Sequence, residues 1–228
     1  FGATIFLIAQ MYNINANNHT LVLIWLIGVL PLVYAFVSVP IAGLSSLLFF
    51  VWIGLFVFRN ISFEKALGDF FALPVLYLVV GLLFLGIGGL HYLSNKFKDI
   101  ARMYRLWGIE VALLSVFLLT LRFFSGNYDG HHIREDAIIS SQFTAGFAIF
   151  SILAIIFLVV NWFFNKAEEI SLIESPVSLG LLGMALIFFF FPSTTNIYVV
   201  LFNLIFAALV GVILYAGYER EDMKLVNL

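Results

Sequence analysis

The chain has 228 residues, of which 63% are apolar and 11% are charged, and its mean hydropathy is +1.11. Soluble domains carry about 25% charged residues, so this composition excludes a soluble globular protein and indicates an integral membrane protein. The net charge of −2, without a long basic run, argues against nucleic acid as a partner. Because the 228 residues include no cysteine, they form no disulfide, thiolate metal site or thiol nucleophile.

Continuous apolar runs predict an all-α, polytopic transmembrane helical bundle with about eight spans. In chain order we expect the spans at Phe1–Tyr12, Leu21–Ser38, Pro40–Phe58, Phe70–Tyr92, Leu106–Phe124, Phe143–Phe164, Pro176–Phe191 and Ile197–Tyr218. Residues 1–228 are treated as a single transmembrane domain. Since the chain begins inside one apolar run and ends as another starts, we expect an internal fragment of a longer protein.

Proline and glycine predict the local geometry of several spans. Pro31 lies inside the second span, where it predicts a kink, and Pro40 suits the first turn of the third, so these two spans should form a tight hairpin. Ser175 and Pro176 are expected as the N-cap and first residue of the seventh span. Close packing of the fourth span is predicted by its small residues Gly81, Gly86, Gly88 and Gly89.

The segment Ser94–Arg105 carries four of the eleven basic residues and lies between two spans. Its apolar residues recur at helical spacing, which predicts an amphipathic helix in the membrane surface, with a face made of Phe97, Ile100, Ala101 and Tyr104. The alternation of spans places seven basic residues on the side of this segment and four on the other. This bias favours a cytoplasmic position for the segment.

The first two spans carry recognisable motifs. Gln10 and Tyr12 end the first apolar run, and a Trp-x-x-Gly-x-x-Pro-Leu pattern follows at Trp25, Gly28, Pro31 and Leu32. Over roughly the first 35 residues the chain resembles the bacterial inner-membrane proteins of domain of unknown function 2157. Asn13 stands where that family usually has His. The resemblance implies a cytoplasmic amino-terminal segment and further spans outside this chain, and it implies no function.

Glu110 is the main candidate for a functional residue, because an acid inside a membrane span is energetically expensive. It follows Arg105 by five residues, about 7.5 Å along a helix, which places it within reach of the lipid headgroups. We favour an interfacial or helix-pairing role for this carboxylate. Proton or cation handling is the alternative.

Other polar residues have simpler interpretations. Gln10 and Asn203 lie inside spans, where interhelical hydrogen bonding is expected. His91, at the cytoplasmic end of the fourth span, is expected to be a capping or interfacial residue. A polar external loop gathers the potential ion ligands Asp129, His131, His132, Glu135 and Asp136. Adjacent histidines usually point apart, so we favour a solvated loop over an ion site.

The sequence carries no phosphate-binding loop, nucleophile elbow or zinc-protease helix motif. We therefore expect no enzyme activity, no catalytic residue, and no cofactor or metal. The favoured interpretation is a multi-pass protein of the bacterial inner membrane that serves as a structural or interaction subunit. Its expected partners are the lipid bilayer and either another membrane protein or a second copy. The alternative is a transporter or channel-like carrier of a small solute or ion that uses Glu110.

Overall fold

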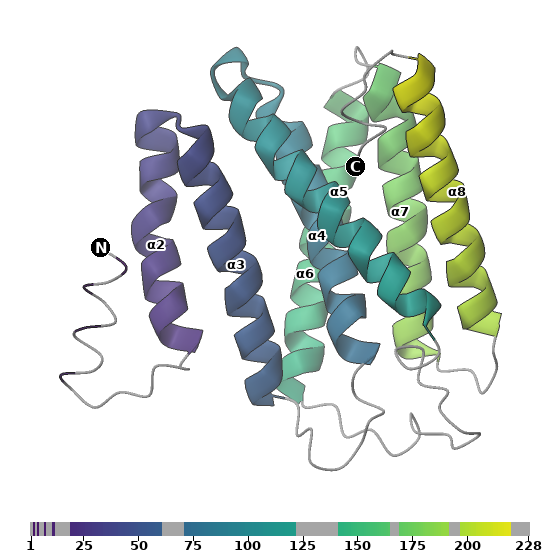
Figure 1. The fold of residues 1–228 in the computed structure, drawn as a ribbon, viewed down its shortest axis with the longest axis horizontal. Helices are drawn as coiled ribbons and strands as arrows, with labels where there is room; N and C mark the ends of the chain where they lie inside the picture. Colours follow the sequence, from purple (N-terminus) through teal and green to yellow (C-terminus); the bar gives the residue numbers. More distant parts are fainter. Residues whose placement is uncertain are drawn as a thin grey trace.

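The computed structural model describes residues 19–60, 71–121, 141–164, 169–191 and 197–219, together with Gly2, Thr4, Leu7 and Met11. Across those ranges the chain is helical and contains no strand, which confirms the all-α prediction. The helices, shown in Figure 1, are α2 (His19–Phe36), α3 (Val39–Asn60), α4 (Ala72–His91), the 3-10 turn η2 (Asn95–Phe97), α5 (Lys98–Thr120), α6 (Ser141–Phe164), α7 (Glu169–Phe190) and α8 (Ile197–Glu219).

The expected number of about eight spans is too high for the part of the chain that the structure describes, which holds six candidates. Within the described ranges, six helices are long and apolar enough to cross a membrane: α2, α3, α4, α5 with η2, α6 and α8. The segment expected as the seventh span forms a shorter apolar helix, Glu174–Phe190, inside α7. The span expected at Phe1–Tyr12 lies outside the described residues except for four isolated positions.

Helix α4 is the central element of the bundle, and 15 of its 20 residues are buried. It packs against α5 on one side and α6 on another, and it also contacts α7. A Cβ atom added at Gly81 would lie 2.9 Å from the carbonyl oxygen of Gly108 in α5. One added at Gly86 would lie 2.8 Å from Cβ of Phe157 in α6. The prediction that small residues bring the fourth span close to its neighbours is therefore confirmed.

The basic segment does not form a separate surface helix, contrary to prediction. From Lys98 onward it is the first part of α5, one continuous helix that runs to Thr120. Three residues of the predicted apolar face, Ile100, Ala101 and Tyr104, are buried, which confirms that they share one side of the helix. The same side of the helix continues as Gly108, Ala112, Ser115, Val116 and Leu119, all of them buried. One continuous buried face packs on α4, and the charged residues Asp99 and Arg102 project from the other face without interrupting the helix.

Helices α2 and α3 form the predicted tight hairpin, connected by Val37 and Ser38 alone. The amide of Ser38 donates to the carbonyl oxygen of Val33 at 3.3 Å, a 6→1 bond of the Schellman type. Val37 occupies the left-handed position that this motif requires, with φ of 48°. Pro31 lies inside α2, as expected.

Helix α7 begins earlier than its sequence predicts. Ser175 and Pro176 were expected as its N-cap and first residue, but the helix starts at Glu169 and includes Pro176. In a membrane protein, neighbouring helices and polar side chains compensate for the hydrogen bond that an internal proline removes. Ser175 is fully buried, and its hydroxyl accepts a hydrogen bond from Asn161 of α6. It therefore lies at a contact between two helices and not at a helix terminus.

The helices run alternately up and down through the bundle (Figure 1). The α2–α3 turn, the connection from α4 to α5, the end of α6 and the start of α7 lie at one end. We call this the basic end, because the described residues Lys96, Lys98, Arg102 and Arg105 belong to it. Six of the eleven basic residues lie outside the described residues, so the division of basic residues between two sides remains a prediction. Which side faces the cytoplasm remains a prediction.

Candidate functional site

Glu110 lies on the exposed side of α5, opposite the side that packs on α4. Gly108 contacts the backbone of α4. Glu110 follows it by two residues, which corresponds to a rotation of about 200° around the helix axis, so Glu110 points away from that contact. Its neighbours one helical turn away in either direction are also exposed, Leu106 at 39% and Leu114 at 58%. We define the outer stripe of α5 as the exposed residues Leu106, Glu110, Leu114 and Phe117.

Glu110 is near the middle of α5. It lies twelve residues after Lys98 and ten before Thr120, about 18 Å and 15 Å along the axis at 1.5 Å per residue. Arg105, from which the depth of Glu110 was estimated, is turned into the bundle. Contact of Glu110 with the lipid headgroups remains a prediction. No hydrogen bond or ion pair joins Glu110 to any residue that the structure describes.

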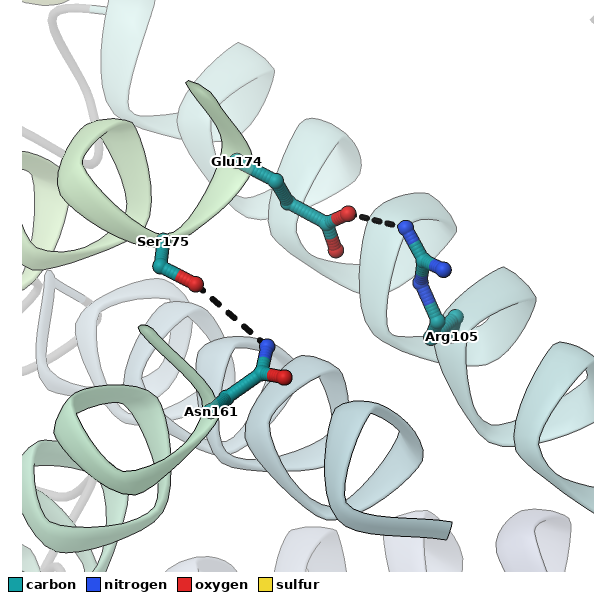
Figure 2. Close-up of polar contacts among 4 residues, drawn as sticks. All are labelled: Arg105, Asn161, Glu174 and Ser175. Atoms are coloured by element: carbon teal, nitrogen blue, oxygen red, sulfur yellow. Dashed lines mark hydrogen bonds and ion pairs between the residues drawn. The ribbon is translucent and has the colours of Figure 1, made fainter. Parts of the chain in front are cut away.

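A partly buried ion pair joins α5 to α7 near the basic end. The Arg105 guanidinium donates to the Glu174 carboxylate, and the two side chains are only 16% and 17% exposed (Figure 2). The same guanidinium lies over the ring of Tyr92, with 5.0 Å between its central carbon and the ring centroid. Gly88 makes room for the Arg105 stem, since a Cβ there would lie 2.5 Å from Cγ of Arg105. The pair neutralises both charges and fixes α7 against α5.

A second polar contact lies beside the ion pair and joins α6 to α7. Nδ2 of Asn161 donates to Oγ of Ser175 at 3.3 Å, and both residues are buried, at 4% and 0% exposed (Figure 2). Gly89 of α4 lies against the Asn161 side chain, where a Cβ atom would collide with the amide group. The polar cluster of Arg105, Asn161, Glu174 and Ser175 thus connects α5, α6 and α7 around the end of α4.

This polar cluster was not predicted from the sequence. Asn161 carried a usable signal, because it is a lone amide in an apolar run, as Gln10 and Asn203 are. Glu174 carried none, because it precedes Ser175 and Pro176, where the seventh span was expected to begin. The 69-residue separation between Arg105 and Glu174 gives no local pattern that would pair them.

Tyr34 and His91 connect the α2–α3 hairpin to the central helix. Oη of Tyr34 lies 3.1 Å from Nε2 of His91, and Nδ1 of the same ring lies 2.7 Å from the carbonyl oxygen of Ile87. A carbonyl can only accept, so in the neutral imidazole Nδ1 donates and Nε2 accepts from the tyrosine hydroxyl. The rings of Phe97 and Tyr104 contact His91 as well. His91 therefore has a packing role at a helix end, in keeping with its expected interfacial character.

Asn203 forms the interhelical hydrogen bond that its position predicts. Its Nδ2 donates to the carbonyl oxygen of Thr120 at 3.3 Å and to that of Val199 at 2.8 Å. Thr120 is the last residue of α5, and the final carbonyls of a helix lack partners within it. The amide therefore satisfies one end of α5 while it joins that helix to α8.

The remaining predicted site residues lie outside the described residues. They are Gln10, Asp129, His131, His132, Glu135 and Asp136. Within the described part of the chain, no group of three or more His, Asp or Glu side chains could hold a metal ion. The external ion loop remains a prediction, as does the role of Gln10.

Comparison with known proteins supports the resemblance seen in the first two spans. Residues 1–42 match the sequence model of a family described as a predicted membrane protein, DUF2157. The matched region includes α2 and the first residues of α3. Neither the curated proteins nor the solved structures contain a match to this chain. The chain is a polytopic membrane protein that is similar, over this region, to a family without an assigned function.

Proposed function

We propose that this protein is a structural or interaction subunit of a membrane assembly in the bacterial inner membrane. The observation that carries the proposal is the outward direction of Glu110 in the middle of α5. Ionisable residues within spans are costly, and they pair with other groups or face a protein interior or water. Glu110 has no bonded partner among the described residues. We infer that another chain supplies the group that stabilises it, and not the part of this chain that lies outside the described residues.

Two polar contacts inside the bundle support the same proposal, because each joins two helices. Arg105 and Glu174 neutralise one another, and Asn161 bonds to Ser175. Each of the buried serines Ser45, Ser46, Ser115 and Ser151 donates to a carbonyl of its own helix. The ion pair and the Asn161–Ser175 bond therefore hold helices together, and the four serines are satisfied within their own helices. The proposal includes no catalytic step.

A carrier of a small solute or ion that uses Glu110 is the alternative. In that case the path past the carboxylate would follow the outer stripe of α5, and a neighbouring chain would have to form its second wall. The carrier hypothesis thus also requires a partner at this surface. We prefer the subunit proposal because it explains the outward carboxylate without an additional water-filled path.

Native mass spectrometry of the intact protein tests the proposal. The full chain would be extracted from its own membrane in a mild detergent or in lipid nanodiscs, and the mass of the particle measured. We expect a second chain at fixed stoichiometry. A particle that contains one copy of this protein and only lipid, at every detergent concentration that keeps it folded, would contradict the proposal.

A further inference from the structure

We propose that the outer stripe of α5 docks a transmembrane helix of another protein, and that this helix places an arginine or lysine beside Glu110. The inference rests on the proposed function and adds the surface and the chemistry of the partner. It depends on three properties of the structure: the composition of the outer stripe, its contrast with other exposed helix faces, and the positions of the chain's own basic residues.

The outer stripe has the composition of a helix-docking surface. Leu106, Leu114 and Phe117 are 39%, 58% and 43% exposed, and they provide apolar contacts on both sides of the carboxylate. Their spacing of three to four residues matches the face that one helix presents to another. A partner helix packed along this face would cover Glu110 and remove it from lipid at the same time.

Other outward faces of the bundle suit lipid chains without a partner. Helix α6 exposes Ile149, Ile152 and Ile156 along its middle, and α8 exposes Val200, Leu204 and Val212. These side chains are aliphatic, and acyl chains solvate them as well as protein does. The outer stripe of α5 differs from them by a charge at mid-helix. That charge requires a counter-charge at the same depth.

A second copy of this chain does not provide that counter-charge. In a dimer with its two-fold axis along the membrane normal, Glu110 of one copy lies at the depth of Glu110 of the other, and the two like charges repel. The basic residues nearest along α5 are Arg105, which is bound to Glu174, and Arg102, which pairs with Asp99. The other basic residues fall in connections or at the ends of the spans. Charge complementarity therefore favours a different protein with a basic residue inside its span.

Site-specific photo-crosslinking in the native membrane tests the inference. A photoreactive phenylalanine analogue would replace Leu114 in the full-length protein, and the matched control would carry it at Ile152 of α6, which is 56% exposed. We expect an adduct from position 114 and none from position 152. Mass spectrometry of the adduct should locate the crosslink in a transmembrane segment that contains an arginine or lysine.

Charge substitution distinguishes the ion pair from general apolar contact. Glu110→Gln keeps the size and hydrogen-bonding ability of the side chain, and it should lower the adduct yield at position 114 by about tenfold. Glu110→Lys should abolish the adduct, and replacement of the partner's basic residue by Glu should restore it. Because Glu110 is exposed and lies outside the core, these variants should keep the wild-type melting temperature. If one of these variants fails to fold, the crosslink formed by the protein with wild-type Glu110 still tests the inference, because it locates the partner segment and shows whether that segment contains a basic residue.

The possible results separate this inference from the proposed function. An adduct to another span of the same protein, to a second copy of this chain, or to a partner span without a basic residue overturns the inference, and native mass spectrometry then decides the subunit role separately. An unchanged adduct yield with Glu110→Lys also overturns it. No adduct at either position, together with a lone chain in native mass spectrometry, overturns both proposals.

Discussion

Gly81 of α4 and Gly108 of α5 bring the backbones of these two helices into direct contact. A Cβ atom at Gly108 would lie 2.8 Å from the carbonyl oxygen of Gly81, and the reverse distance is 2.9 Å. A backbone atom cannot move aside as a flexible side chain can. The crossing of α4 and α5 therefore depends on glycine at both positions, and it sets the direction in which the outer stripe of α5 points.

We predict that Gly81→Ala destabilises the protein by roughly 1–3 kcal/mol, the usual cost of overpacking a core. The two helices would have to separate to admit the methyl group, which loosens the contacts of α4 with its neighbours. Thermal unfolding of the purified protein, followed by circular dichroism, measures the effect. Gly180→Ala in α7 is the matched control, because an added Cβ there has no atom within 4 Å. A melting temperature for Gly81→Ala equal to that of this control would show that the contact does not constrain packing.

Val37→Gly is predicted to be more stable than Val37→Ala by about 1 kcal/mol. Both variants lose the packing of the valine side chain against the core, and the left-handed backbone costs a residue with a Cβ roughly 1–2 kcal/mol. Valine is unfavourable at its φ of 48°, and glycine adopts that value without strain. Part of the gain is offset by the larger conformational entropy of glycine in the unfolded chain. The measurement is again the melting temperature, with Val37→Ala as control because it removes the branch and keeps the Cβ. A lower stability for Val37→Gly than for Val37→Ala would contradict this account of the turn.

Much of this fold could be predicted from the sequence because the bilayer permits few solutions. A backbone in lipid must satisfy its own hydrogen bonds, so continuous apolar runs become helices, and most of the expected spans correspond to observed ones. Pro40 and the short connection before it predicted the hairpin of α2 and α3. The outward direction of Glu110 could also have been predicted, because Gly108 and Ala112 mark the packed side of α5.

Features that depend on contacts between distant segments could not be predicted in this way. The basic segment was expected as a separate helix because its charges suggested a membrane surface, but its apolar face continues along α5. Pro176 suggested the start of a helix, but α7 begins at Glu169 and contains Pro176 in its interior. The pairing of Arg105 with Glu174 follows from the packing of α7 on the bundle, which no local pattern of residues encodes.

Removal of one member of the partly buried ion pair of Arg105 and Glu174 is predicted to be destabilising. Arg105→Met leaves the Glu174 carboxylate without its partner. The loss of one partner of a fully buried pair typically costs about 3–5 kcal/mol, and we expect about 2–3 kcal/mol for this partly buried pair. The double variant with Glu174→Leu should recover much of this loss, because it buries no unpaired charge. Arg102→Met is the control, since Arg102 and Asp99 are 69% and 72% exposed and such a pair contributes at most about 1 kcal/mol. An equal loss of stability for Arg105→Met and Arg102→Met would show that the Arg105–Glu174 pair contributes no more to stability than the exposed pair.

The orientation of the bundle is predicted from its basic residues. The described residues Lys96 and Lys98 lie at the end where α4 connects to α5, and cytoplasmic connections carry the excess of Lys and Arg. A reporter that is fluorescent only in the cytoplasm should therefore be active when it is fused after Asn95. A phosphatase that is active only outside the cytoplasm should be active when it is fused after Asp129. Exchange of the two reporters between the two sites is the control, and both should then be silent. The reverse pattern would place the basic end outside the cytoplasm and contradict the inferred orientation. The position and direction of Glu110 within the bundle would be unchanged, because they follow from α5 alone.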